Sequence, residues 1–370
     1  MKYCYLCDEK LTELNSSQEH ILLNSIGGRL KSKALLCKDC NSKFGHNTDR
    51  ELSKQLQFLS NYLNIKREKG ENQPLKDLIS ESGKKYNLIE GSKPALSKPE
   101  FQIEKKDNQI HYNISARDEN ELLGILKGLK KKHPELDIEE AKKHFQWKEE
   151  YLDEKLNHKM TIGGELAFKS IVKTAVNYYV LERNEKTQIS HLLAYLRDEE
   201  NLSIIHHFNP KKTIFKKQVG EVAHTIHLVG NKHNKVLYCF IEFFSCYSFL
   251  VLLSENYTEK SFTSTYVYDV IKSKKIERKI NLNLKSDFIK ENIKNPQPNF
   301  DIVQAKINRA MEIGNKIQID KQISHITNKT IQKVFDKYSY EPKVTKEMIN
   351  EISNEVATEF VKFKYRNKIK

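Results

Sequence analysis

The sequence predicts an α+β protein in which a small N-terminal module precedes a larger mixed body. Four of the six cysteines fall within the first 40 residues, as two C-x2-C pairs. Branched and aromatic runs separated by short polar stretches fill residues 222–279, as in an antiparallel strand meander. Residues 301–364 return to helical spacing with few glycines. A cysteine-rich start, a strand-rich middle and a helical end are therefore expected.

Length and charge bound the number of domains and the kind of partner. A chain of 370 residues exceeds one compact domain. We expect a small domain over residues 1–69, a mixed linker and α+β region over 70–160, and an α+β body over 161–370. Lys and Arg number 63 against 49 Asp and Glu, so the net charge is +14. This surplus favours a polyanion such as nucleic acid, although solubility or an acidic protein partner would also explain it.

The elements of the first two regions follow from periodicity. A helix is expected at or just after the second cysteine pair, because apolar residues recur at helical spacing at Phe44, Leu52, Leu56, Leu59 and Leu63. The charged stretch KREKGENQP, which contains a glycine and a proline, predicts a linker after it. Alternating runs at 101–103 and 110–114 predict strands. A helix from Glu119 should end before Pro134.

The body is expected to begin with a core helix, ELAFKSIVKTAVNYYVLER, which follows Gly163 and Gly164. Residues 236–253 carry a single charge, but their aromatic and branched content and the lack of a clustered basic flank predict two buried strands rather than a membrane span. Buried free thiols are expected at Cys239 and Cys246. The histidines of the neighbouring strands are expected to be structural, because positions three apart on a strand face opposite ways: His206, His207, His224 and His227.

The two cysteine pairs predict a metal site. Cys4 and Cys7 are separated by 29 residues from Cys37 and Cys40, and four thiolates suit a tetrahedral Zn²⁺ that is closed to solvent. Such a zinc stabilises a segment too small to have its own core, and it hydrolyses nothing itself. Clustered cysteines without a preceding signal sequence favour a reducing compartment, and we expect the cytoplasm.

Short elements around these cysteines stand in the order CYLC, EHI, GGR, CKDCN and FGHNTD. In this order and spacing, the first 60 residues or so resemble the zinc-knuckle branch of the HNH, or ββα-metal, endonucleases. The resemblance implies a DNA endonuclease that uses Mg²⁺ or Mn²⁺, held by Glu19 and Asn41. Many family members with bodies of this size belong to phage restriction or defence systems, so it also implies an antiphage nuclease with an activating ligand or partner protein.

The chemistry of these residues agrees with the resemblance. Hydrolysis of a phosphodiester needs a nucleophile and stabilisation of charge on the phosphoryl and leaving oxygens. An imidazole can take a proton from water, so His20 is the candidate general base. Glu19 and Asn41 offer hard oxygen ligands for the cation. A basic run, made of Arg29, Lys31 and Lys33, is expected to contact flanking phosphates without reading bases.

The sequence departs from the family pattern at two places. The middle asparagine, which in the family holds the loop and the base histidine, is replaced by KSKALL, so backbone groups or Asn24 are expected to take that role. Many members also carry a metal-binding histidine where this chain has Gly45, and His46 lies one residue off that face, as a weaker candidate ligand. Asp49 is expected to be a structural or hydrogen-bonding group.

The body leaves several alternatives open. Residues 271–295 carry eight Lys or Arg and three Asp or Glu, and this run either follows a phosphate backbone or is a solvated surface. The C-terminal helix is expected to pack on the body or on a second subunit, and cleavage of both strands would need a homodimer or two nicks. A zinc module that docks the body on nucleic acid or protein without catalysis, and an RNA endonuclease, are the competing functions.

Overall fold

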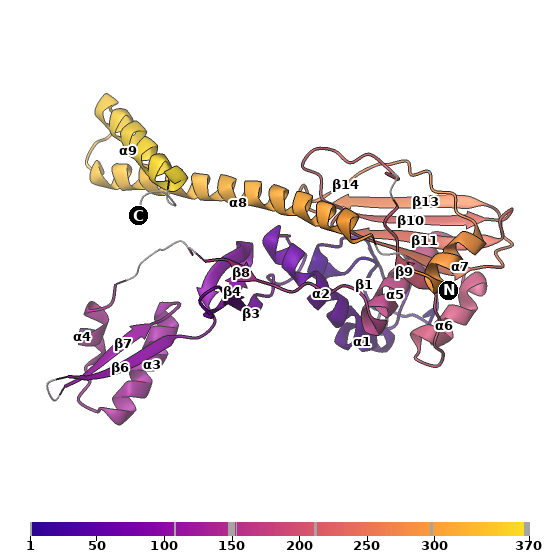
Figure 1. The fold of residues 1–370 in the computed structure, drawn as a ribbon, viewed down its shortest axis with the longest axis horizontal. Helices are drawn as coiled ribbons and strands as arrows, with labels where there is room; N and C mark the ends of the chain where they lie inside the picture. The colour runs from indigo at the N-terminus through magenta and orange to yellow at the C-terminus, as the bar shows by residue number, and fades with distance from the viewer. Residues whose placement is uncertain are drawn as a thin grey trace. The chain divides into compact units, whose positions relative to one another are not determined.

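The computed structural model describes residues 2–106, 109–146, 152, 154–210, 213–296 and 299–365. These residues form helices and antiparallel sheets, which confirms the predicted α+β class (Figure 1). They divide into two compact units. The first contains Met1–Lys76, Asn87–Lys93 and His158–Met311, and the second contains Asp77–Tyr86, Pro94–Asn157 and Glu312–Lys370. The domain limits expected from the sequence stay predictions.

The first unit starts with two short strands and two helices. Strands β1 (Glu19–His20) and β2 (Lys31–Ser32) pair antiparallel, with the 3-10 turn η1 (Asn24–Ile26) between them. Helices α1 (Lys38–His46) and α2 (Thr48–Tyr62) follow. The periodicity predicted one helix here, but Asn47 has non-helical backbone angles and separates two. The apolar spacing continues across this break, which is why it was not visible in the pattern.

A six-stranded sheet forms the centre of the first unit, in the order β14-β13-β10-β11-β12-β9. The strands are β9 (Ile205–His207), β10 (Ala223–Asn231), β11 (Val236–Phe243), β12 (Tyr247–Ser254), β13 (Phe262–Asp269) and β14 (Lys274–Lys275). The apolar stretch thus forms two buried strands, as predicted, and among the described residues there is no helix long and apolar enough to cross a membrane. Cys239 lies in β11 and is buried, whereas Cys246 is buried in the turn before β12 rather than in a strand.

Helices cover both faces of this sheet. On one face α5 (Glu165–Arg183) contacts β10, β11 and β12, and it also packs against α2 (Figure 1). The 3-10 turn η3 (Thr187–Ile189) and α6 (Ser190–Leu196) follow it. On the other face Ile289 of α7 (Ser286–Lys294) packs into the apolar cluster with Tyr238 and Phe240. The core helix predicted from its apolar stripe is therefore α5, and it joins the sheet to the N-terminal helices.

The second unit holds a hairpin and helices. Strands β6 (Glu100–Lys106) and β7 (Gln109–Ser115) form the hairpin, and α3 (Glu119–Lys132) and α4 (Ile138–Lys143) follow. Another sheet, with residues from both units, has the order β5-β4-β3-β8 and is made of β3 (Leu75–Ser80), β4 (Lys85–Ile89), β5 (Lys93–Leu96) and β8 (Leu156–Asn157). The turn η2 (Glu90–Ser92) precedes β5.

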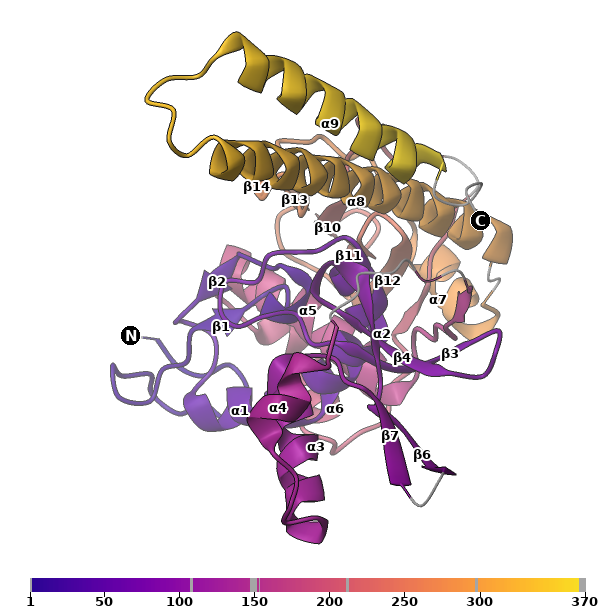
Figure 2. The same ribbon diagram turned by 90° about the vertical axis from the view of Figure 1, so that its left-hand side faces the viewer.

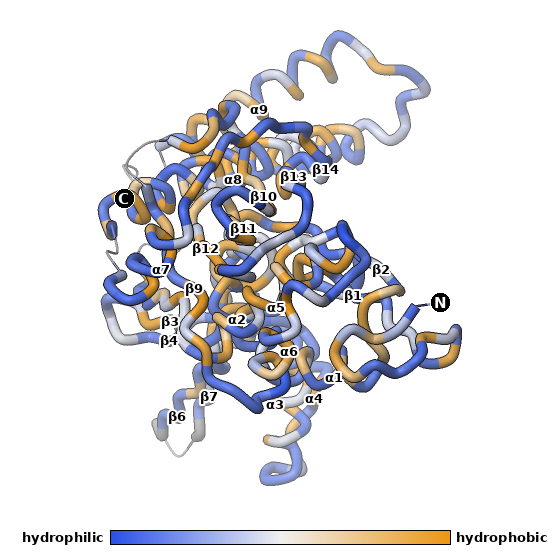
Figure 3. Tube along the Cα trace, turned by 90° about the vertical axis from the view of Figure 1, so that its right-hand side faces the viewer, coloured by the Kyte–Doolittle hydropathy of each residue, from blue (hydrophilic) through white to orange (hydrophobic). Residues whose placement is uncertain are grey.

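Two long helices, α8 (Phe300–Lys337) and α9 (Lys346–Tyr365), end the described chain and lie antiparallel (Figure 2). Lys337 Nζ of α8 lies 2.6 Å from Glu351 of α9, and Lys333 Nζ lies 3.2 Å from Glu355. Hydrophilic and hydrophobic residues alternate along both helices (Figure 3). The C-terminal helix therefore packs within its own chain, against α8.

Candidate active site

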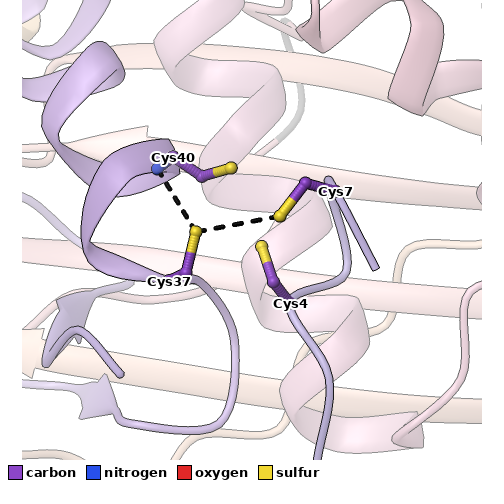
Figure 4. Close-up of side chains that lie close together, drawn as sticks. All are labelled: Cys4, Cys7, Cys37 and Cys40. Carbon is purple, nitrogen blue, oxygen red and sulfur yellow. Dashed lines mark hydrogen bonds between the residues drawn. The ribbon is translucent and has the colours of Figure 1, made fainter. Parts of the chain in front are cut away.

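The four N-terminal cysteines converge as the sequence predicts. Their Sγ atoms all lie within 4.8 Å of one another, and those of Cys7 and Cys37 are 3.8 Å apart (Figure 4). A tetrahedral zinc with Zn–S bonds of about 2.3 Å places its sulfurs about 3.8 Å apart. The cluster thus fits a structural zinc. It is also the one group of three or more His, Cys, Asp or Glu within the described ranges that is arranged to hold a metal.

The cysteine knuckle brings a strand and a helix together. Cys37 caps α1 and its Sγ accepts a hydrogen bond from the Cys40 amide at 3.5 Å. Ser16 bridges to Cys37, so the chain that leads into β1 runs beside the start of α1. On the first turn of that helix Asn41 donates from Nδ2 to Ser17 Oγ at 2.6 Å. One side chain of the predicted site is therefore held next to the strand that carries the other two.

Glu19 and His20 face opposite sides of β1, because successive residues of a strand alternate. The Glu19 residue is 2% exposed, whereas the His20 side chain is 24% exposed. The imidazole is therefore partly exposed to solvent. The carboxylate is directed into the protein.

Two residues of α5 contact the buried carboxylate. Lys173 Nζ lies 2.7 Å from Glu19 Oε1, and Asn177 Nδ2 donates to the same oxygen at 2.8 Å. Burial raises the pKa of Glu19 above its ordinary value, and Lys173 opposes that rise. Burial alone would lower the pKa of Lys173, but the carboxylates of Asp49 and Glu19 raise it above its ordinary value. The lysine is therefore a charged group enclosed by two acidic residues.

Asp49 belongs to the same cluster. Its Oδ2 lies 2.5 Å from Lys173 Nζ, and its Oδ1 accepts a hydrogen bond from Ser170 Oγ at 2.6 Å. The ammonium group also lies 5.0 Å from the centre of the Phe44 ring. The structure therefore places Asp49 among hydrogen-bond donors of α5.

The imidazole of His20 is held by a residue that sequence reasoning missed. Glu68 Oε2 lies 3.0 Å from His20 Nε2, and its other oxygen pairs with Lys31. Hydrogen bonds from Lys31 and then His20 lower the pKa of Glu68 to about 2. The Asn24 side chain accepts from the Glu68 amide at 2.8 Å and donates to the Lys69 carbonyl at 3.2 Å. Asn24 thus holds the loop as the sequence suggested, but the histidine contacts Glu68.

The basic residues expected at phosphates lie around the exposed side of β1. Arg29 Nη2 donates to the Lys66 carbonyl at 2.7 Å, Lys31 pairs with Glu68, and Lys33 is exposed. The preceding turn needs its glycines, because a Cβ at position 28 would lie 1.9 Å from the Leu22 carbonyl oxygen. These contacts fix the basic run beside the imidazole.

The histidines expected to be weak ligands or structural groups lie as follows. His46 is exposed at the end of α1, and its Nδ1 bonds to the Ser42 carbonyl at 2.7 Å. His224 Nε2 bonds to the Ile26 carbonyl at 2.8 Å, and His227 Nδ1 bonds to Thr265 at 2.8 Å. His206 is buried and His207 half-buried in β9.

The oxygens proposed for a divalent cation are of the right chemical kind. A carboxylate and an amide oxygen are ligands that Mg²⁺ accepts. Asn41 donates from Nδ2, so its Oδ1 remains as an acceptor. In the bonds described above, Lys173 and Asn177 both contact Oε1 of Glu19 and not Oε2. By chemical kind, this donor set suits a magnesium or manganese ion.

Residues 4–57 match a family of proteins described as HNH endonuclease. The N-terminal segment is therefore an HNH domain with a zinc knuckle, as its motifs predicted. No curated protein and no solved structure matches the chain. Glu68, Lys173 and Asn177 all lie beyond the matched residues.

Proposed function

We propose that the protein is a metal-dependent HNH endonuclease that hydrolyses phosphodiester bonds of DNA. The observation that supports this most is the ββα arrangement, in which one zinc knuckle holds Asn41 beside the strand of an accessible, carboxylate-held His20. The match of residues 4–57 to HNH endonucleases supports the same reaction class. A role in antiphage defence, in the cytoplasm and under the control of a partner protein or ligand, rests on the family resemblance.

Each residue of the site has a separate role in this proposed reaction. Glu68 holds Nε2 of His20, which leaves Nδ1 to take a proton from the attacking water. Glu19 and Asn41 would hold a divalent cation, which when bound neutralises charge on the phosphoryl and leaving oxygens. Arg29, Lys31 and Lys33 would contact the flanking phosphates and position the backbone.

Further positive charge lies on the body next to this segment. The Gly27 turn adjoins Val270, since a Cβ on the glycine would lie 3.8 Å from the valine side chain. Directly after Val270, the turn and short strand β14 expose three lysines, Lys272, Lys274 and Lys275. The first 70 residues contribute twelve Lys or Arg against eight Asp or Glu, so most of the surplus charge lies in the body. We therefore assign substrate binding to both parts and cleavage to the HNH domain.

A cleavage assay tests the reaction and the substrate together. Duplex DNA, single-stranded DNA and RNA are incubated with Mg²⁺ or Mn²⁺ and with wild type, His20→Ala or His233→Ala, an exposed histidine in the turn before β11. We expect wild type and His233→Ala to cleave duplex DNA. His20→Ala should be slower by about 100-fold or more, since it lacks the base. Cleavage of RNA alone would replace DNA as the substrate, and full activity of His20→Ala would contradict the mechanism.

One observation favours a second function. The carboxylate of Glu19 is buried and already faces an ammonium ion, as in a structural ion pair. A zinc module that docks the body on nucleic acid, without catalysis, would be built in this way. It predicts that His20→Ala and Asn41→Ala keep the biological function, whereas Cys37→Ser loses it with the zinc.

A further inference from the structure

Helix α5 lies outside the residues that match the HNH family, yet one of its faces packs into the HNH domain. Ser170, Lys173 and Asn177 are three and four residues apart and therefore share this face. All three are buried, with at most 1% of each exposed. Each contacts a residue of the HNH domain. This is more than a helix packing on a neighbour through apolar side chains.

The contacts converge on the acidic residues of the motif. Lys173 Nζ bridges Glu19 Oε1, at 2.7 Å, and Asp49 Oδ2, at 2.5 Å. Asn177 donates to Glu19 Oε1 at 2.8 Å, and its own Oδ1 accepts from Tyr5 Oη at 2.8 Å. Tyr5 lies between the first two cysteines. The carboxylate of Glu19 is thereby tied to both the zinc knuckle and α5.

We propose that α5 is part of the nuclease site, and that Lys173 is a positioning residue that fixes the carboxylate of Glu19 for a divalent cation. The inference rests on the proposed function, in which Glu19 holds that cation. A carboxylate held by hydrogen bonds before the metal arrives binds it more tightly than a freely rotating one, because less order is lost on binding. Lys173 and Asn177 both hold the same oxygen, so they set the direction of the carboxylate group.

The same helix supplies a matched control. Lys169 lies one turn before Lys173 and is 3% exposed. It pairs with Asp198 and lies 5.2 Å from the centre of the Tyr195 ring, away from the acidic residues of the motif. Lys169→Met and Lys173→Met therefore both remove a buried, paired ammonium group from α5. Only the second removes a contact to Glu19.

The experiment measures Mn²⁺ affinity by calorimetry on the zinc-loaded, full-length protein without nucleic acid. Zinc content and thermal unfolding are recorded first. Lys173→Met should retain zinc and bind Mn²⁺ about 10- to 100-fold more weakly than wild type, and Lys169→Met should stay within about twofold. An unchanged affinity in Lys173→Met would overturn the proposal. So would a tighter affinity, which would mean that the ammonium group occupies the place of the cation.

A second variant covers the case in which Lys173→Met does not fold. Asn177→Ala removes the other donor to the same oxygen and leaves the buried charges in balance. It should also weaken Mn²⁺ binding, and an affinity equal to that of wild type would reject the positioning role.

Cleavage measured in parallel separates this inference from the proposed function. Mn²⁺ binding that depends on Lys173, without cleavage of any substrate by wild type, supports the positioning of Glu19 and rejects the nuclease. Cleavage by wild type, together with an unchanged Mn²⁺ affinity in Lys173→Met, supports the nuclease and rejects the positioning of Glu19 by Lys173. A wild-type protein that binds no Mn²⁺ rejects both.

Discussion

At the scale of single residues, the contact between His20 and Glu68 distinguishes this site from the expected motif. The sequence shows the histidine but offers no middle asparagine to hold it. In the structure a carboxylate from the loop after α2 approaches Nε2 to 3.0 Å, and Asn24 holds the backbone of that loop. A carboxylate at one ring nitrogen fixes the tautomer and the orientation of the imidazole, which makes the other nitrogen the better base.

Removing this carboxylate should slow cleavage without weakening substrate binding. We expect Glu68→Ala to lower kcat by roughly 10- to 100-fold with little change in KM, because a misdirected base is less effective. Glu68→Gln should recover part of the rate, since its amide oxygen still accepts a hydrogen bond. Steady-state kinetics on a single DNA substrate provide the measurement.

Glu71→Ala, an exposed glutamate in the same loop, is the control and should behave as wild type. If Glu68→Ala matched it, the imidazole would not depend on this contact.

Glu68 could not be predicted because its segment, KREKGENQP, has the composition of a solvated linker. By contrast, the zinc ligands, His20 and Asn41 were all visible, since they belong to local patterns with fixed spacing. Lys173 and Asn177 were missed for a different reason. They lie more than 150 residues from Glu19, and on their own helix they interrupt an apolar stripe without forming any motif.

At the scale of elements, local patterns were sufficient for most of the fold. The strands β11 and β12 follow from their branched and aromatic content, and the helix α5 and the long C-terminal helices follow from the period of their apolar residues. The break between α1 and α2 did not, because Asn47 is an exposed polar residue that is compatible with either a helix or a turn. The order of strands in the sheet could not be predicted either, because it depends on contacts between segments far apart in the chain.

The central sheet should lose stability in mild acid. Burial lowers the pKa of both His224 and His227 from 6.5 to about 4, so the folded protein keeps them neutral. Below pH 6.5, His224 and His227 bind protons in the unfolded chain but remain neutral in the folded chain. Their contribution to stability is therefore present in full above pH 6.5 and falls as the pH drops toward 4.

We expect the free energy of unfolding to fall by about 1.5 kcal/mol for each histidine between pH 6.5 and 5. The change is measured by urea unfolding at both pH values, monitored by far-ultraviolet circular dichroism. His227→Gln should reduce the pH dependence relative to wild type. An identical slope in that variant would show that His227 is not a source of the effect.

At the scale of the whole molecule, the surplus charge of +14 is spread over the HNH domain and the body. The three lysines directly follow Val270, whose side chain adjoins the Gly27 turn that precedes the basic run of the HNH domain. Binding of a phosphate backbone by such lysines releases counterions and depends steeply on salt.

Neutralising these lysines should weaken DNA binding and flatten its salt dependence. For Lys272→Gln, Lys274→Gln and Lys275→Gln combined, we expect the slope of log affinity against log salt to fall by about 2 to 3, or about 0.9 per phosphate contact. Fluorescence anisotropy without divalent metal measures it. The matching triple change at 130–132, three exposed lysines at the end of α3, should leave the slope unchanged. Equal effects of the two triple variants would indicate that DNA is attracted by the overall charge and does not contact these three lysines in particular.

The position of α5 in the chain has a consequence for where the HNH domain can be cut. The residues between α2 and α5 belong largely to the second unit, whereas the HNH domain and α5 share the first. The part of this segment that lies in the second unit supplies none of the contacts to Glu19 described above. A segment cut at the limits of the HNH match, residues 4–57, would lack the lysine and the asparagine of α5 that contact Glu19. The residues that contact Glu19 are therefore far from it in the sequence, and α5 supplies them only after position 160.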